Sequence, residues 1–133
     1  MTSKVTYLGA LRTTSTHIKS GSQIISDAPT DNNGKGQAFS PTDTVANALA
    51  SCMMTIMGIK AQEMNIDLEG STAEVTKIMK QEPRMIAKID IIFYMNTVAD
   101  ARTKLILERV ARTCPVELSL HPDIERTITF HWK

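Results

Sequence analysis

The chain has 133 residues, and 15 basic residues nearly balance 14 acidic ones, leaving a net charge of +1. This length is typical of one domain with its own core, so we expect a single domain over residues 1–133. The balanced charge argues against nucleic acid or an anionic membrane as a partner. No stretch approaches the ~20 apolar residues of a membrane span and no signal peptide is evident, so we expect a cytoplasmic protein.

The first third of the chain has the pattern of short extended segments. Residues 5–11, 12–18 and 23–27 predict three strands, and the small polar residues between the last two predict a turn. Residues 28–37 are rich in Pro, Asn and Gly, which is typical of a surface loop. We therefore expect a meander followed by a loop.

A long helix follows this loop. Ser40 is a good cap, Pro41 suits the first helical position, and Asp43 completes a capping box, so the helix should run to about residue 64. Almost no polar face is present before Lys60, and a helix that is apolar all round is buried on every side. Because a chain of this size can hardly cover such a helix alone, we expect a sheet on one side and a partner subunit on the other.

The rest of the chain predicts two further strands, a helix and a last strand. Residues 67–80 and 85–95 should form a hairpin, residues 100–113 have helical spacing, and residues 124–132 alternate as a strand should. In the second of these segments the apolar face should comprise Met85, Ala87, Ile89, Ile91, Phe93 and Met95. The order of elements predicts an α+β fold with a largely antiparallel sheet wrapped around a long central helix.

The two cysteines are the main candidates for chemistry. In a reducing cytoplasm a pair of cysteines more often indicates redox catalysis, sensing or metal binding than a structural disulfide, although two inert core cysteines are about as common. Cys52 lies about three turns into the long helix, beyond the reach of the helix dipole, and burial favours its neutral thiol. A nearby cation is therefore needed to keep this sulfur ionised.

Arginine is the best cation for that purpose because it stays charged when it is desolvated. Arg12 on an N-terminal strand and Arg126 on an otherwise apolar strand face are the two that could point inward. Arg84 lies in a turn, and the arginines of residues 100–113 form a solvated helix face. The residues alone do not choose between Arg12 and Arg126.

Cys114 has a different local setting. It precedes Pro115 at the start of a short helix, where backbone N–H groups could stabilise a thiolate, so local electrostatics favour it over Cys52 as a low-pKa thiol. The three histidines show no ligand spacing, and we expect neither a metal nor a cofactor. Met53, Met54, Met57 and Met64 are ordinary core residues, or else they line a pocket for a flexible apolar substrate, with Met53 and Met57 as the candidates for its lining.

Three segments together identify a resemblance. The sequence FSPTD at 39–43, ALASC at 48–52 and CPV at 114–116 resemble the OsmC/Ohr family of thiol peroxidases. The resemblance covers essentially the whole chain. It implies an OsmC-like fold and an intertwined homodimer whose two central helices pack together and whose sites lie at the subunit interface.

The resemblance also implies roles for single residues. Cys52 would attack the peroxide O–O bond to give a sulfenic acid, and Cys114 would condense with it to an internal disulfide. A thiol reductant, a lipoylated protein in some family members, would then reduce the disulfide. Arg12 would be the activating cation. The glutamate that pairs with this arginine in many family members is Thr42 here, so either the neighbouring Asp43 substitutes for it, or the arginine is held differently and peroxidase efficiency suffers.

The sequence therefore predicts a cysteine peroxidase for organic hydroperoxides, with hydrogen peroxide as a second substrate. The alternative is a family member with weak or lost peroxidase activity that binds small molecules or senses the redox state of thiols. A purely structural protein would leave the pattern of the two cysteines unexplained.

Overall fold

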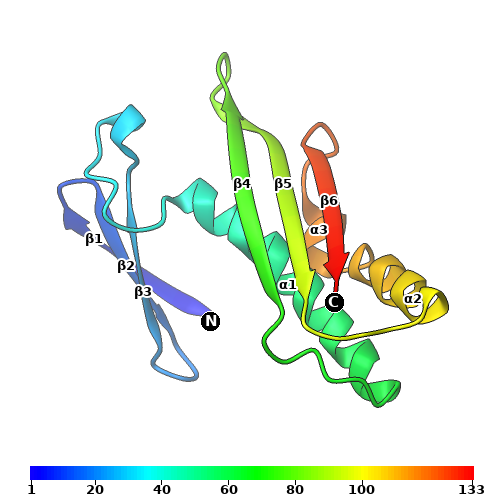
Figure 1. Cartoon of the computed structure of the whole chain (residues 1–133). Helices are drawn as coiled ribbons and strands as arrows, with labels where there is room; N and C mark the ends of the chain where they lie inside the picture. Colours follow the sequence, from blue (N-terminus) through cyan, green and yellow to red (C-terminus); the bar gives the residue numbers. More distant parts are fainter. The chain divides into compact units, whose positions relative to one another are not determined.

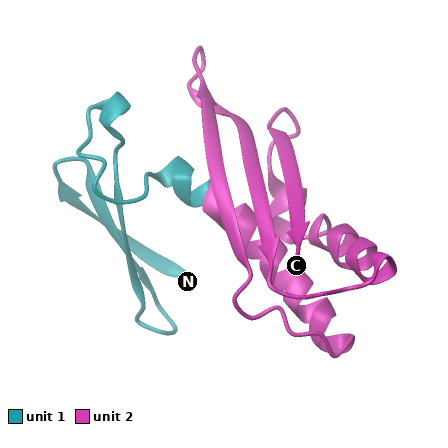
Figure 2. Cartoon of the chain, in the orientation of Figure 1, with its two compact units in different colours: residues 1–45 teal, residues 46–133 magenta.

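The computed structural model describes residues 1–133, and the chain forms two compact units (Figure 2). Unit 1 comprises residues 1–45 and unit 2 comprises residues 46–133, so the boundary falls inside the long helix. The single domain expected over residues 1–133 stays a prediction.

Unit 1 contains a three-stranded antiparallel sheet in the order β1-β2-β3 (Figure 1). Strand β1 spans Ser3–Gly9, β2 spans Arg12–His17 and β3 spans Gln23–Asp27. Gly9, with φ of +81°, begins the tight turn between β1 and β2, where a left-handed conformation favours glycine. The predicted meander is thus confirmed.

Unit 1 has no apolar core of its own. Its buried side chains are polar, namely Asp27 and Ser40, whereas Tyr7 and Ile24 are 64% and 59% exposed. A small sheet without a covered apolar face is marginally stable by itself. Unit 1 therefore presents apolar side chains of the kind that a binding partner would cover.

A loop from Ala28 to Phe39 connects β3 to the long helix and includes the short 3₁₀ helix η1 (Thr30–Asn32). Its backbone folds tightly on itself: a Cβ atom at Gly34 would lie 1.7 Å from the carbonyl oxygen of Ala28. Only glycine fits such an approach. This fold brings Gln37 back beside the end of β3.

Helix α1 spans Pro41–Glu63 and begins with the predicted capping box. The Ser40 N–H donates to Asp43 Oδ2 at 2.9 Å, and the Asp43 N–H donates to Ser40 Oγ at 3.0 Å. One side of the helix is buried, through Ala46, Leu49, Ala50, Met53, Met57 and Ala61. The opposite side stays open to solvent, with Ile59 52% exposed.

By length and composition alone α1 could cross a membrane. Its buried side, however, packs into the hydrophobic core of unit 2, as the central helix of a soluble protein does.

Unit 2 contains a second three-stranded sheet, in the order β4-β5-β6 (Figure 1). Strand β4 spans Thr72–Lys80, β5 spans Met85–Met95 and β6 spans Glu125–Trp132. Strands β4 and β5 are antiparallel, but β6 runs parallel to β5. The chain must cross over to reach a parallel strand, and helices make that crossover. The expected largely antiparallel sheet is therefore two separate sheets, one of them mixed.

The start of β5 departs from the predicted alternation. Ile78 pairs with Lys88, but the next residue, Met79, pairs with Ile86, so Ala87 is an extra residue in a β-bulge. The bulge turns Ile86 inward, where it is 8% exposed. The predicted inward positions of Met85 and Ala87 are therefore wrong, whereas the four later ones are confirmed.

Two helices make the crossover from β5 to β6: α2 (Ala101–Ala111) and α3 (Pro115–Ser119). The Trp132 Nε1–H donates to Glu108 Oε1 at 2.8 Å and so links β6 to α2. Phe93 and Phe130 stack on the inner face of the sheet, with ring centroids 5.0 Å apart. The core that these elements enclose also includes Cys114.

Candidate active site

The structure brings the two cysteines together in unit 2. Cys52 lies on α1 and packs against the core cluster that contains Cys114, the residue that caps α3. Both are free thiols, and they lie close enough for the Cys52 sulfur to raise the pKa of Cys114. Cys114 is completely buried, whereas Cys52 is partly exposed. The arrangement thus has one accessible and one protected sulfur, side by side.

Helix α3 fixes the position of the Cys114 sulfur. Pro115 occupies the first position of the helix, and the Glu117 N–H donates to Cys114 Sγ at 3.3 Å. This contact is the hydrogen bond that the sequence predicts at the cap.

The predicted low pKa of Cys114 is nevertheless wrong. Burial raises the pKa of the Cys114 thiol, and the Glu117 N–H only partly offsets this effect. The neighbouring Cys52 sulfur and the Glu117 carboxylate raise the pKa further. Helix α3 has only five residues, so its dipole is small compared with the cost of desolvating a charge. Cys114 is therefore a protonated, protected thiol beside Cys52.

Arg126, the second candidate for the activating cation, lies near Cys114. It pairs in register with Ile89, which is fully buried, so Arg126 is on the inner face of β6, as its place in the sequence pattern predicts. Its Nε atom lies 3.3 Å from Glu117 Oε2. Arg126 is thus the counter-ion of a carboxylate that adjoins Cys114.

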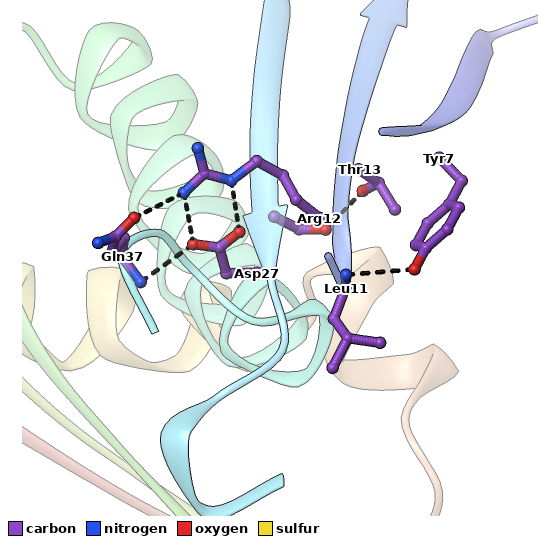
Figure 3. A network of polar contacts seen from close by, with 7 residues as sticks. Tyr7, Leu11, Arg12, Thr13, Asp27 and Gln37 are labelled. Carbon is purple, nitrogen blue, oxygen red and sulfur yellow. Dashed lines mark hydrogen bonds and ion pairs between the residues drawn. The ribbon is translucent and has the colours of Figure 1, made fainter. Parts of the chain in front are cut away.

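Arg12, the first candidate, belongs to unit 1 and is held by a carboxylate and an amide (Figure 3). Its Nε donates to Asp27 Oδ1 at 2.7 Å, and its Nη2 donates to Asp27 Oδ2 at 2.8 Å and to Gln37 Oε1 at 3.1 Å. The Gln37 N–H donates to Asp27 Oδ2 at 3.0 Å. Figure 3 shows that the remaining guanidinium nitrogen points away from both partners.

This bidentate contact changes both pKa values. The hydrogen bond from Arg12 lowers the pKa of Asp27 despite its desolvation, and the Gln37 N–H adds to this effect. The bond to Asp27 raises the pKa of Arg12. Because Arg12 and the cysteines belong to different units, the role of Arg12 toward Cys52 stays a prediction.

Thr42 and Asp43, the positions expected to orient Arg12, take part in the start of α1. Asp43 completes the capping box, and Thr42 Oγ1 lies 3.2 Å from Ser40 Oγ. Of the two alternatives that the sequence left open, the structure shows an arginine held differently, by Asp27.

Met53 and Met57 are both fully buried in the core of unit 2. A groove of about 220 Å³ lies on another side of α1, between this helix and β4. It is lined by Asn47, Ala50, Ser51, Met54, Ala73 and Val75. Met54 therefore lines this groove, and Met53 and Met57 do not.

Sequence reasoning missed three residues: Asp27, Gln37 and Glu117. The signal for Asp27 was available, because Arg12 and Asp27 are paired at the open end of the β2–β3 hairpin, where opposite charges attract. Gln37 gave no signal, since only the folded loop brings it to Asp27. The signal for Glu117 was its place three residues after Cys114, the N-cap of α3, where the backbone N–H can bond to the cap side chain.

Comparisons with known proteins agree with this geometry. A model of the family described as OsmC-like protein matches residues 34–129. A solved structure from Psychrobacter arcticus 273-4, provisionally named an osmotic stress induced and detoxification response protein, is 53% identical. It covers 98% of this chain and 96% of that one, with a TM-score of 0.96. No curated protein matches the sequence.

Two more distant structures share the fold alone. The Legionella pneumophila organic hydroperoxide resistance protein OsmC is 15% identical, covering 98% of this chain and 96% of that one, with a TM-score of 0.72. The organic hydroperoxide resistance protein OhrB of Bacillus subtilis is 16% identical, covering 98% of both chains, with a TM-score of 0.66.

Proposed function

Because the chain belongs to the OsmC-like family, we propose that it is a cysteine peroxidase that reduces organic hydroperoxides, and hydrogen peroxide as a second substrate. The observation that carries this proposal is that two free cysteines distant in the sequence lie in the same part of the core, one partly exposed and one buried. The names of the Legionella and Bacillus proteins support organic hydroperoxides as the substrate class.

The two sulfurs suit the two steps of such a reaction. In the first, the Cys52 thiolate attacks the terminal peroxide oxygen; the S–O bond forms, the O–O bond breaks, and the alkoxide takes a proton and leaves as an alcohol. In the second, Cys114 attacks the sulfenic sulfur of Cys52. The S–S bond forms, the S–O bond breaks, and the Cys114 proton leaves with the hydroxide as water. A thiol reductant, such as a lipoylated protein, then restores both thiols.

The burial of Cys114 supports these separate roles for the two cysteines. A protonated, buried thiol is a poor nucleophile and reacts with peroxide only slowly. The same thiol is close enough to react once its neighbour carries a good leaving group. The arrangement favours Cys52 as the attacking residue and Cys114 as the resolving one.

Arg12 is the proposed cation for the first step. Its guanidinium is charged at every physiological pH, and Asp27 and Gln37 fix its orientation while leaving one nitrogen free for a substrate or sulfur atom (Figure 3). Asp27 would thereby take the place of the family glutamate that is Thr42 in this chain. Met54, the methionine of α1 that lines the groove beside β4, would supply apolar surroundings for the organic part of the substrate, whereas Met53 and Met57 are fully buried in the core.

We propose that the enzyme works in the cytoplasm as a homodimer. The uncovered side of α1 and the coreless sheet of unit 1 both present apolar side chains that a second copy would bury. The proposal requires no cofactor, nucleic acid or membrane.

A weak peroxidase that senses the redox state of thiols is the second candidate. The observation in its favour is the raised pKa of Cys114, which slows disulfide formation and lengthens the life of the sulfenic acid.

The proposal is tested by stopped-flow measurement of cumene hydroperoxide consumption by the reduced protein with an excess of dithiol. We expect saturable turnover that Cys52→Ser abolishes, because no other accessible thiol is present. Thr55→Ala, at an exposed position of the same helix outside the groove, is the matched control and should retain turnover. Slow oxidation of Cys52 that depends linearly on peroxide concentration would favour the sensing function instead.

A further inference from the structure

An ion pair that the proposed reaction does not use adjoins Cys114. Glu117 Oε2 and Arg126 Nε lie 3.3 Å apart, with side chains 24% and 14% exposed. The two atoms are buried and have no hydrogen-bond partner, so the N–H does not point at the oxygen and the contact is electrostatic. The pair therefore acts mainly through its charges.

The ion pair is directly connected to the buried thiol. Glu117 donates its backbone N–H to Cys114 Sγ, and Arg126 donates to the carbonyl oxygens of Ile124 and Glu117. Arg126 thus holds the first turn of α3, the turn that fixes the sulfur, against β6. Of the other elements around Cys114, α1 contributes Cys52, and the residue of β5 beside Arg126 is the apolar Ile89.

The resolving step places negative charge beside the Glu117–Arg126 ion pair. When Cys114 attacks the sulfenic acid, its sulfur loses a proton and becomes transiently negative in a buried place. The Glu117 carboxylate opposes that charge, and a cation bound to the carboxylate reduces the opposition. Removal of Arg126 would leave an uncompensated carboxylate beside the reacting sulfur.

We infer that Arg126 is a positioning residue for Cys114: it neutralises Glu117 and fixes the start of α3, so that the buried thiol can release its proton to attack Cys52. The expected change in the rate of disulfide formation rests on the proposed function. The expected change in the titration of Cys114 does not. Neither the resemblance nor the family match assigns a role to Arg126 or Glu117.

The kinetic test measures disulfide formation after rapid oxidation of Cys52 by one equivalent of cumene hydroperoxide. We expect Arg126→Met to slow this step roughly three- to tenfold, because each pKa unit changes the thiolate fraction tenfold. The oxidation of Cys52 itself should keep its rate. Arg112→Met, which removes an exposed arginine near Cys114, is the matched control and should leave both steps unchanged.

A charge effect is distinguished from a packing effect by a second substitution. In the Glu117→Gln/Arg126→Met double variant no carboxylate remains to be neutralised, so the rate should return to within about twofold of the wild type. Arg126→Lys, which keeps the charge, should also stay close to the wild type. A double variant as slow as Arg126→Met would overturn the inference, since lost packing is not restored by removing Glu117.

The electrostatic test needs no peroxidase activity. In a Cys52→Ser background, Cys114 is titrated by the ultraviolet absorbance of its thiolate. The midpoint should rise with Arg126→Met and fall with Glu117→Gln. If the wild type fails to consume peroxide but these shifts appear, the proposed function fails and the inference stands. If Arg126→Met does not fold, an unchanged midpoint in Glu117→Gln overturns the inference.

Discussion

Arg12 and Asp27 show how one side chain fixes the orientation of another. Asp27 is only 2% exposed, and it keeps its charge because the guanidinium of Arg12 and the backbone of Gln37 bind its oxygens. The arginine in turn loses freedom of orientation and retains one unbound nitrogen. A carboxylate on β3 thus binds this arginine, whereas the resemblance predicted a partner at the start of the central helix.

The pair makes stability depend on pH. The pKa of Asp27 is lowered in the folded chain, chiefly by the hydrogen bond from Arg12, so its contribution is complete above the unfolded carboxyl pKa of about 4. The contribution is lost as the pH falls through the lower, folded value. We therefore expect Asp27→Asn to reduce the free energy of unfolding at pH 7, with a difference from the wild type that shrinks below about pH 4.

Urea unfolding at a series of pH values measures this difference. Asp123→Asn, a change at an exposed acid, should show little difference at any pH. A deficit in Asp27→Asn that stays constant down to pH 2 would mean that the carboxylate is not ionised more readily in the folded chain.

Helix α1 illustrates what hydrophobic pattern can and cannot predict. Its pattern is apolar all round, and the capping box and length are confirmed. The chain itself buries only one side of the helix, because a three-stranded sheet covers one face of the helix it packs on. The pattern therefore predicts a second contact that the single chain does not make.

We expect this second contact to be another copy of the chain. Light scattering on the dilute protein should give twice the mass of one chain, and Ile59→Glu should shift the mass toward that of the monomer, since it places a charge on the uncovered side of α1. Glu125→Gln, at an exposed position on β6, is the control. A monomeric wild type at micromolar concentration would contradict the dimer.

Most of the fold could be predicted because its signals are local. Caps, turns and alternation gave the strands and helices, and three motifs gave the family. The bulge at Ala87 and the parallel β6 were missed, since both depend on pairing between strands rather than on either strand alone. Local signals likewise misjudged Cys114: its cap hydrogen bond was predicted, but burial, which dominates its pKa, is a property of the assembled core.

In the candidate site, too, local sequence signals identified the reactive residues, whereas contacts made only in the folded chain were missed. The two cysteines were identified from the sequence, and the fold brings them together across 62 residues between α1 and α3, a proximity that no local pattern shows. The ion pairs near the candidates, Arg12 with Asp27 and Arg126 with Glu117, each join two different elements, β2 with β3 and β6 with α3. Sequence thus finds reactive residues more readily than the groups that tune them.

The linkage of the two sulfurs after one turnover is the decisive measurement for the proposed reaction. Reduced protein is mixed with one equivalent of cumene hydroperoxide, digested without reductant, and mapped by mass spectrometry. We expect one product, a bridge between Cys52 and Cys114 of the same chain, with the peroxide converted to its alcohol. Bridges only between separate chains, or two free thiols beside unconsumed peroxide, would contradict the proposed reaction.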